Sequence, residues 1–363
     1  MKPTVLVIQE VVPHYRVPFF RFLADELGSR DLDLRVVSSS VLPKVDELGF
    51  PHQRVPTSRW GLSALGTIYR ERPAVLVLPH SARFAPVATT TRFLQSRGRK
   101  QLFWGSGLAR RYGAASEHDR RPAAEPVRRL MLSICDHYLS YTEISTTNIL
   151  NSGYDATRIT TLNNAVEALA TPEQAMTAQR VPLQTLFVAS LVEEKEPLAA
   201  VAIADQLRLL APGASLHIVG DGPLRPQCEQ AANGREWVHY HGTQRGQSLR
   251  ELALASDIAI IPGRVGLAVL DMASAGLPMA TFAVSRHTAE IAYLKDGINS
   301  LFLSDDINTA AKELGTLLSD RPALERMRNE ALSTASKYTI RRMAVNFAEG
   351  VMASLSLRLH VRR

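Results

Sequence analysis

Residues 257–278 combine an apolar run, a tight turn and a helical pattern in a way that suits an anionic ligand. The apolar run predicts a buried strand, Pro262 and Gly263 form the turn, and a helix is predicted to begin near Gly266. Small residues in the turn let a ligand come close to the backbone, and first-turn N–H groups attract a diphosphate. Asp271, about one turn further on, is placed to accept hydrogen bonds from ribose hydroxyls.

Three further polar segments follow predicted strands in the C-terminal half. Lys195 comes shortly after Thr185–Ala189, the Gly-Asp-Gly-Pro turn at 220–223 follows Ser215–Val219, and Gly242 ends a third strand. The carboxyl ends of parallel strands meet at one edge of a sheet, which is where ligands bind in such sheets. We therefore expect these segments to lie close together around one ligand.

Taken in order, these segments resemble the large family of retaining GT-B glycosyltransferases, of the family 4 type, which includes sucrose synthases, mannosyltransferases and bacterial surface-polysaccharide enzymes. The family signature is Glu-Gly-Phe-Gly-Leu, a second Glu after seven intervening residues, and then Ala-x-x-x-Gly-x-Pro-Val. This chain has Gly263-Arg264-Val265-Gly266-Leu267 and Asp271, then Ala273–Pro278, a Pro-Gly-x-Val-Gly-Leu variant. Other segments that resemble family motifs, in the same order, are 187–195, 217–223, 238–242 and 287–299.

The resemblance implies a site for a nucleotide-sugar donor in the C-terminal half. Lys195 matches a family lysine that neutralises the donor diphosphate and the charge on the leaving group. The positions that match donor-binding motifs are Ser190, Gly222, Pro223, Gly242, Gly263, Val265, Gly266, Leu267, Asp271 and Glu290.

Three of these positions depart from the family pattern. Gly263 stands where the family has its first glutamate, Asp271 replaces the second, and Ser190 replaces an arginine that binds the diphosphate. Loss of such a stabilising group costs a few kcal/mol unless another group compensates. Arg264 and Arg286 are candidate replacement cations, and we choose Arg264 first because it precedes the helix by only two positions.

The N-terminal half offers candidates for catalysis and for binding an acceptor. His80 follows the predicted strand Val75–Leu78, and a histidine at a strand end is a candidate catalytic residue. The segment after the first strand carries His14, Tyr15 and Arg16, which we predict to contact the acceptor. Trp104 and Ser106 end another strand, where many relatives place a histidine, and are predicted acceptor contacts as well.

The composition and the alternation of elements predict an α/β protein with two doubly wound, Rossmann-like domains that face a cleft, the GT-B architecture that the resemblance implies. The chain has 363 residues, and this length exceeds what one hydrophobic core usually organises. Apolar residues make up 45% of the chain and charged residues 21%. The predicted divisions are an acceptor domain at 1–164, a linker at 165–183 and a donor domain at 184–339. A helix at about 340–363 could pack on either domain, including back on the first.

The elements can be predicted individually from apolar runs and helical patterns. The predicted strands are 5–8, 34–38, 75–78, 101–104, 138–140, 185–189, 215–219, 238–240, 258–261, 279–282 and 300–303. The predicted helices are 18–27, 85–96, 126–135, 197–210, 248–256, 267–275, 307–318, 322–338 and 340–357.

The charge limits the partners that the chain can have. The net charge is +7, and arginines crowd residues 110–129, which predicts peripheral contact with an anionic membrane. No nucleic-acid-binding motif accompanies them, so nucleic acid is not a predicted partner. The two cysteines have no metal-ligand spacing and fit a reducing cytosol, and no apolar stretch is long enough to span a membrane. The expected location is the cytoplasm, on the inner face of the membrane.

The sequence therefore predicts transfer of a sugar from a UDP- or GDP-sugar to a hydroxyl of a lipid-linked glycan, with retention at the anomeric carbon. The resemblance implies that no metal or other cofactor is required, and Asp31-Leu-Asp33 fits a solvated turn. Two alternatives remain open. One is a catalytically silent partner subunit that binds a sugar nucleotide or a glycan, and the other is a UDP-sugar epimerase of the same fold.

Overall fold

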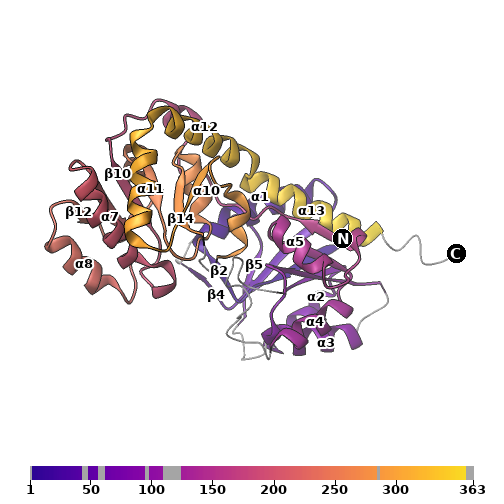
Figure 1. The fold of residues 1–363 in the computed structure, drawn as a ribbon. Coiled ribbons are helices and arrows are strands. Elements are labelled where there is room, and N and C mark those ends of the chain that lie inside the picture. The colour runs from indigo at the N-terminus through magenta and orange to yellow at the C-terminus, as the bar shows by residue number, and fades with distance from the viewer. Residues whose placement is uncertain are drawn as a thin grey trace. The chain divides into compact units, whose positions relative to one another are not determined.

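The computed structural model describes residues 2–42, 48–55, 62–94, 98–108, 124–283 and 287–356. These residues form two compact units (Figure 1). Unit 1 contains the described residues up to 108, together with 124–167 and 340–356, and unit 2 contains 168–339. Each unit is a parallel sheet with helices packed against it, so the predicted fold class is confirmed.

Unit 1 is built on a parallel sheet of seven strands in the order β5-β3-β1-β6-β7-β8-β9. The strands are β1 (Thr4–Ile8), β3 (Asp33–Ser38), β5 (His52–Arg54), β6 (Val75–Pro79), β7 (Lys100–Gly105), β8 (His137–Ser140) and β9 (Ile159–Thr161). The central strands are continuous apolar runs because helices cover both of their faces. Beyond the ends of β1 and β3, β2 (Val11–Pro13) pairs with β4 (Ser40–Leu42).

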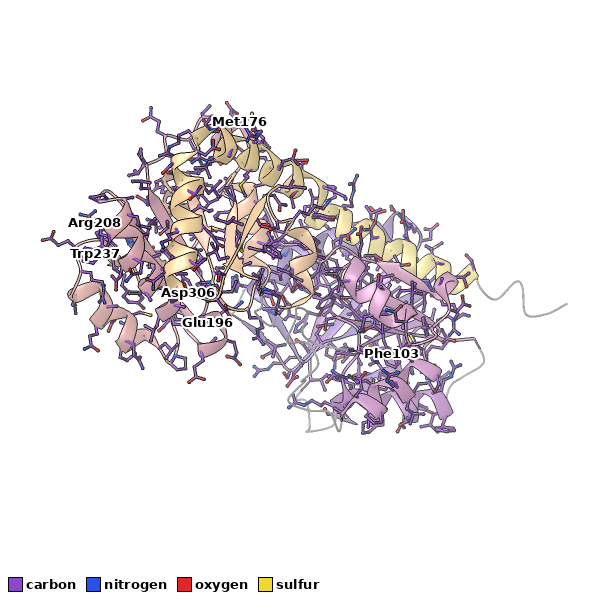
Figure 2. The ribbon with its side chains drawn as sticks, in the orientation of Figure 1. Phe103, Met176, Glu196, Arg208, Trp237 and Asp306 are labelled. Carbon is purple, nitrogen blue, oxygen red and sulfur yellow. The ribbon has the colours of Figure 1, made fainter. Side chains whose placement is uncertain are left out.

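Three helices of unit 1 share one apolar core. They are α2 (Leu65–Glu71), α3 (Ala85–Phe93) and α4 (Glu125–Ser133), which lie side by side in Figure 1. Phe103 of β7 lies inside this core (Figure 2).

A second pair of helices in unit 1 joins residues that are far apart in the sequence. Helix α1 (Val17–Gly28) packs along α13 (Ile340–Ser356), which also contacts β8 and β9. Gly350 lets α13 lie close to β8, since a Cβ atom at this position would lie 2.5 Å from Leu139 Cδ2. The remaining α-helix of the described part of unit 1 is α5 (Glu143–Leu150).

Unit 2 has a parallel sheet of six strands in the order β12-β11-β10-β13-β14-β15. The strands are β10 (Gln184–Val188), β11 (Ser215–Val219), β12 (Val238–Tyr240), β13 (Ile258–Ile260), β14 (Met279–Phe282) and β15 (Ser300–Leu303). The helices are α6 (Pro172–Met176), α7 (Pro197–Leu210), α8 (Arg225–Asn233), α9 (Gly246–Ala255), α10 (Ala268–Ser274), α11 (Ile307–Ser319) and α12 (Arg321–Lys337). Arg208 of α7 lies over the ring of Trp237, 5.7 Å from its centre (Figure 2).

Short 3₁₀ turns complete the described chain: η1 (His14–Arg16), η2 (Leu62–Ala64), η3 (Ala82–Phe84), η5 (Ala156–Arg158), η6 (Glu193–Lys195) and η7 (Ala289–Tyr293). The predicted linker, 165–183, is not a separate segment, because unit 2 begins at residue 168 and includes α6. Helix α6 begins at a capping box in which Thr171 and Gln174 each bond the backbone of the other. The capping box is visible in the sequence, but the polar composition of this stretch led to the prediction of a linker.

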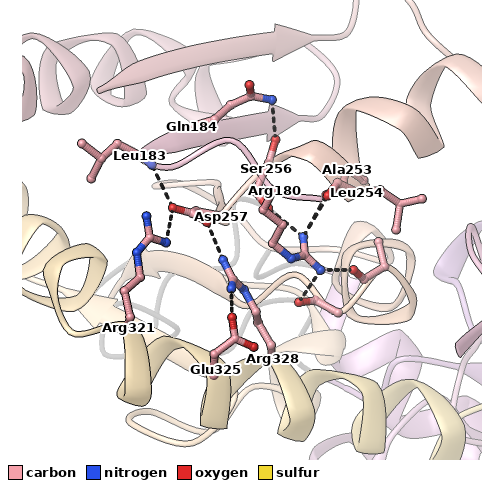
Figure 3. Close-up of polar contacts among 12 residues, drawn as sticks. Arg180, Leu183, Gln184, Ala253, Leu254, Ser256, Asp257, Arg321, Glu325 and Arg328 are labelled. Atoms are coloured by element: carbon pink, nitrogen blue, oxygen red, sulfur yellow. Dashed lines mark hydrogen bonds and ion pairs between the residues drawn. The ribbon is translucent and has the colours of Figure 1, made fainter. Parts of the chain in front are cut away.

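The amino ends of the unit 2 strands are held by a buried ionic network around Asp257, which precedes β13 (Figure 3). Its carboxylate accepts hydrogen bonds from Arg321 at 2.7 Å and from Arg328, and also from the Leu183 N–H. Arg180 donates to backbone carbonyls at the ends of α9 and α10, which satisfies acceptors that a helix end leaves open. A cavity of about 420 Å³ lies beside this network.

Candidate donor-binding site

The motif residues of unit 2 come together at the carboxyl edge of its sheet. Ser190, which is exposed, follows β10, and β10 lies between β11 and β13. The turn after β11 packs directly on the segment after β10, since a Cβ atom at Gly222 would lie 2.6 Å from the Leu191 carbonyl oxygen. Gly242, with φ +65°, accepts a hydrogen bond from Gly220 N–H at 2.9 Å, and Pro223, which follows Gly222, is exposed.

The turn that carries Lys195 is bonded to the loop that follows β13. Gly263 N–H donates to the Lys195 carbonyl at 3.3 Å, and Arg264 N–H donates to the Glu194 carbonyl at 2.6 Å. A Cβ atom at Gly263 would lie 2.4 Å from the Glu194 carbonyl oxygen and 2.6 Å from the Lys195 carbonyl carbon. Both obstacles are backbone atoms, so no side chain fits at this position while the two segments stay paired. The glycine is therefore required by the packing of the loop.

Restoring the family's glutamate at this position is expected to impair the site. In Gly263→Glu, the clash must separate the loop from the 193–195 turn, and overpacking of this kind costs about 1–3 kcal/mol. We expect a lower melting temperature and weaker nucleotide binding, both measured by thermal unfolding with and without UDP. Gly234→Glu is the matched control, because the nearest atom to its Cβ position is 3.6 Å away. Tighter nucleotide binding by Gly263→Glu would contradict this account.

Two cations lie next to each other in the paired segments. The Lys195 ammonium donates to the Arg264 carbonyl oxygen. Burial first, and then the positive charge of Arg264, lower the pKa of Lys195 to about 8, whereas Glu290 and Glu194 act in the opposite direction. The buried Nε of Arg264 has no hydrogen-bond partner among the described residues. The site thus holds positive charge that its protein neighbours only partly neutralise.

Backbone N–H groups without a partner follow directly after Val265. A Cβ atom at Gly266 would lie 3.4 Å from Lys195 Nζ, so the ammonium reaches the start of the segment that leads into α10. Among the described residues, no hydrogen bond is made by the N–H groups of Gly266, Leu267 and Ala268. Unpaired N–H groups beside an ammonium form a site that favours an anion.

Two residues that carried no predicted role hold this loop in shape. The buried His287 accepts a hydrogen bond from Val265 N–H at 3.3 Å through Nδ1, and its Nε2 donates to the Phe282 carbonyl at 3.1 Å. Thr288 Oγ1 lies 2.6 Å from the Val265 carbonyl oxygen. Both polar backbone groups of Val265 are therefore occupied, and its side chain is buried. Val265 positions the loop and does not offer a free donor to a ligand.

Two carboxyl groups flank the loop. Burial raises the pKa of Asp271 in α10 to about 7, and no charge or hydrogen bond of the described residues contributes to this shift. A ribose diol that donated hydrogen bonds to it would favour the ionised form. Glu290 is 5% exposed, lies 2.5 Å from Thr288 Oγ1, and is close enough to Lys195 to raise its pKa. Leu267, partly exposed, lies between Gly266 and α10.

His80, which the sequence predicts to be catalytic, lies in the core of unit 1. His80 is 6% exposed, and both ring nitrogens are engaged, Nδ1 with the Tyr138 hydroxyl and Nε2 with the Arg128 carbonyl, each at 3.0 Å. A histidine whose two nitrogens are bonded inside a core has no free nitrogen with which to exchange a proton. Its partners lie 58 and 48 residues away in the sequence, so no local pattern could reveal them.

Arg16 and Trp104, both predicted to contact an acceptor, are also buried in unit 1. Arg16 bonds the Asn164 side chain and the Ala165 carbonyl, and its guanidinium carbon lies 5.5 Å from the centre of the Trp104 ring. Trp104 is 4% exposed and packs against Phe19 at 5.5 Å. Both side chains are therefore packed inside unit 1.

Other predicted residues remain accessible or fall outside the described chain. His14 and Tyr15 are exposed on η1, with their rings 5.6 Å apart, and Ser106 is partly exposed after β7. Arg286 and the part of the arginine-rich segment before residue 124 lie outside the described residues. No group of three or more metal-ligating side chains is found in the part of the chain that the structure describes.

The C-terminal half matches a known family model. Residues 182–320 match the model described as Glycosyl transferases group 1. A glycogen synthase of Mycobacterium tuberculosis is 30% identical over 129 residues. This match covers 34% of the chain and 31% of that protein, so the chain matches about a third of the length of this relative.

Solved structures match over nearly the whole chain at low identity. The Anabaena protein Alr3699/HepE in complex with UDP superposes with a TM-score of 0.72 at 12% identity, covering 97% of this chain and all of that one. The lipopolysaccharide outer core galactosyltransferase WaaB gives 0.69 at 15% identity, covering 96% and 99%. At these identities the likeness shows the fold, which is GT-B.

Proposed function

We propose that this chain, whose residues 182–320 belong to the group 1 glycosyl transferases and which as a whole has the GT-B fold, moves a sugar from a nucleotide-sugar donor to a hydroxyl group. The observation that carries the proposal is the adjacent pair Lys195 and Arg264, set beside unpaired N–H groups at the carboxyl edge of unit 2. A nucleoside diphosphate has the charge and the acceptor oxygens that this arrangement lacks.

The same arrangement suits the chemistry of the transfer. As the bond between the anomeric carbon and the diphosphate breaks, negative charge grows on the leaving phosphate oxygen. Lys195 and the N–H groups of Gly266 and Leu267 stabilise that charge, and Arg264 supplies the cation that Ser190 does not. We propose that these groups let the reaction proceed without a metal or other cofactor, and with retention at the anomeric carbon as in the resembling family.

For the acceptor we propose a hydroxyl of a lipid-linked glycan in cell-surface polysaccharide synthesis, on the cytoplasmic face of the membrane. Two observations support this choice. The matched WaaB structure is a lipopolysaccharide galactosyltransferase by its description, and His14 and Tyr15 expose polar and aromatic groups after the first strands of unit 1. Aromatic faces and ring nitrogens suit a sugar ring and its hydroxyls. None of the described helices is long and apolar enough to cross a membrane.

The proposal is tested by thermal unfolding of the whole chain with UDP, GDP, ADP, CMP and the corresponding sugar nucleotides, with and without EDTA. We expect one base to raise the melting temperature, an effect that the chelator leaves unchanged. The shift should shrink as pH rises through about 8, because the diphosphate binds the protonated Lys195. Without ligand, the effect of rising pH on stability has the opposite sign. Lys195 has a lower pKa folded than unfolded, so its contribution to stability grows from about pH 8 upward.

A shift that disappears with EDTA would overturn the metal-independent mechanism. Failure of every nucleotide to shift the melting temperature would overturn the donor site. If a nucleotide binds but no acceptor glycan and no water accepts the sugar from its sugar nucleotide, the silent-partner alternative replaces transfer. Interconversion of two UDP-sugars that differ in configuration at one ring carbon would instead identify an epimerase.

A further inference from the structure

The cavity of about 420 Å³ in unit 2 lies at the amino edge of the sheet. Residues that precede three strands line it: Pro182 before β10, Asp257 before β13 and Gly276 before β14. Helices α6 and α12 supply the other lining residues. Because the strands of this sheet are parallel, its amino edge is opposite to the carboxyl edge where Lys195 lies. The volume is within the range of small-molecule sites, about 300–1,000 Å³.

The charged side chains that line the cavity are three arginines and two carboxylates, which leaves one positive charge in excess (Figure 3). They are Arg180, Arg321, Arg328, Asp257 and Glu325. Asp257, 1% exposed, is shared by Arg321 and Arg328, and Glu325 pairs with Arg328 as well. Among the described residues, Arg180 bonds backbone carbonyls and makes no ion pair. The cavity is therefore more favourable for an anion than for a cation.

Two of these arginines have donor groups without an acceptor. Within the described part of the chain, Arg321 contacts only the Asp257 carboxylate, through Nη1 at 2.7 Å, and its side chain is 42% exposed. Its Nε and Nη2 can therefore donate to a ligand. The buried Nε of Arg328 has no partner among the described residues either. Burial, followed by the positive charge of Arg328, lowers the pKa of Arg180 to about 10 although Asp257 and Glu325 oppose this shift.

The cavity also has apolar lining residues. Met176 of α6, which is 70% exposed (Figure 2), and Leu332 of α12 both contribute to it. A guanidinium group binds two oxygens of one phosphate through its parallel N–H groups. Arginine donors and apolar side chains in a single cavity suit a small molecule that carries an anionic group at one end.

We propose that this cavity binds a phosphate monoester of a small organic molecule, with the phosphate at Arg321 and the organic group against Met176 and Leu332. The phosphate oxygens accept hydrogen bonds from Nε and Nη2 of Arg321, and their charge offsets that of Arg180 and Arg328. A phosphate monoester suits the site better than a carboxylate, because it carries more charge and three acceptor oxygens. The inference does not rest on the proposed reaction, since the donor site lies at the opposite edge of the sheet.

The test is isothermal titration calorimetry of the whole chain with phenyl phosphate, inorganic phosphate, benzoate and phenol. We expect phenyl phosphate to bind most tightly. Inorganic phosphate lacks the apolar group and benzoate has less charge, so each should bind about tenfold more weakly. Phenol, which has no anionic group, should not bind. Binding of benzoate or phenol as tight as that of phenyl phosphate would overturn the proposal.

Two variants place the binding in the cavity. Arg321→Met should weaken the binding of phenyl phosphate by about tenfold or more, because it removes charge-assisted hydrogen bonds. Its matched control is Arg326→Met, since Arg326 is an exposed arginine of α12 that does not line the cavity. Asn329→Asp adds a negative charge to the lining without touching the ion pairs, and should weaken binding by about fivefold. Asn308→Asp, on the exposed side of α11, is its control and should have no effect.

An unchanged melting temperature without ligand shows that each variant folds, and if Arg321→Met does not fold, Asn329→Asp decides. The proposal is overturned if phenyl phosphate does not bind, or if these variants bind it as tightly as their controls. It is also overturned if Lys195→Met abolishes the binding, because the phosphate then occupies the donor site. A chain that binds phenyl phosphate in the cavity but no nucleotide would overturn the proposed donor site and leave this inference in place.

Discussion

Replacing Lys195 by methionine is expected to lower kcat/KM for the sugar-nucleotide donor by about 10²–10³-fold, the effect of removing one stabilising group from a developing oxyanion. Methionine keeps the unbranched stem and removes only the charge and its hydrogen bonds. Arg264 alone cannot replace the lost group, because Lys195 Nζ is the atom that reaches Gly266 and the unpaired N–H groups. The measurement is steady-state transfer with the best donor of the nucleotide panel.

The control for this variant is Lys312→Met, which removes an exposed lysine of α11 in the same unit. It should leave kcat/KM unchanged, so that a general effect of net charge can be separated from the effect at the site. The pH profile adds a second readout. The wild-type rate should fall as pH rises through about 8, and this fall should be absent from the variant. Equal rates for wild type and Lys195→Met would contradict the assignment.

The largest loss of stability is expected for Asp257→Ala. This substitution leaves Arg328, only 7% exposed, without its buried carboxylate partner, and it removes the acceptor of the Leu183 N–H. Breaking a buried ion pair by removing one partner costs about 3–5 kcal/mol, because the remaining charge is stranded in a poorly solvated site. The free energy of unfolding, from urea denaturation of the whole chain, should fall by that amount in the transition that reports unit 2.

A matched substitution lies in the same network. Glu325 also pairs with Arg328 but is 61% exposed, so Glu325→Ala should cost about 1 kcal/mol or less. A second test removes both charges. Asp257→Leu combined with Arg328→Met should recover much of the loss, because neither ion is then stranded. If Asp257→Ala and Glu325→Ala destabilise equally, burial is not what makes the network important.

The sequence predicted unit 2 more completely than unit 1, and the reason is physical. All six strands of unit 2 were predicted, most of them as apolar runs, and α7, α11 and α12 follow helical patterns of 14, 13 and 17 residues. The elements missed in unit 1 include β5 (His52–Arg54), a polar edge strand, and α2 (Leu65–Glu71), which has only two turns. An edge strand buries little and therefore carries little hydrophobic pattern. Helix α8 was missed in unit 2 because its sequence is mostly polar.

The candidate site was predicted in part for a similar reason. Lys195, Arg264 and Gly266 come together because parallel strands end at one edge, which follows from the order of the elements. The contacts of His287 with Val265 depend on the path of a loop 22 residues away and have no signal in the sequence. The same limit applies to His80. Its position at a strand end was predicted, but its hydrogen-bond partners were not.

The chain order of the two units has a consequence for how the protein is made. Unit 2 is continuous from 168 to 339, whereas α13, which packs on α1 and brings Gly350 against Leu139, is encoded after it. On the ribosome, unit 2 can therefore fold before unit 1 is complete, although unit 1 begins first. Until residues 340–356 emerge, the apolar side of α1 that meets α13 stays uncovered. Nascent unit 1 thus exposes this apolar side for about the time needed to translate unit 2.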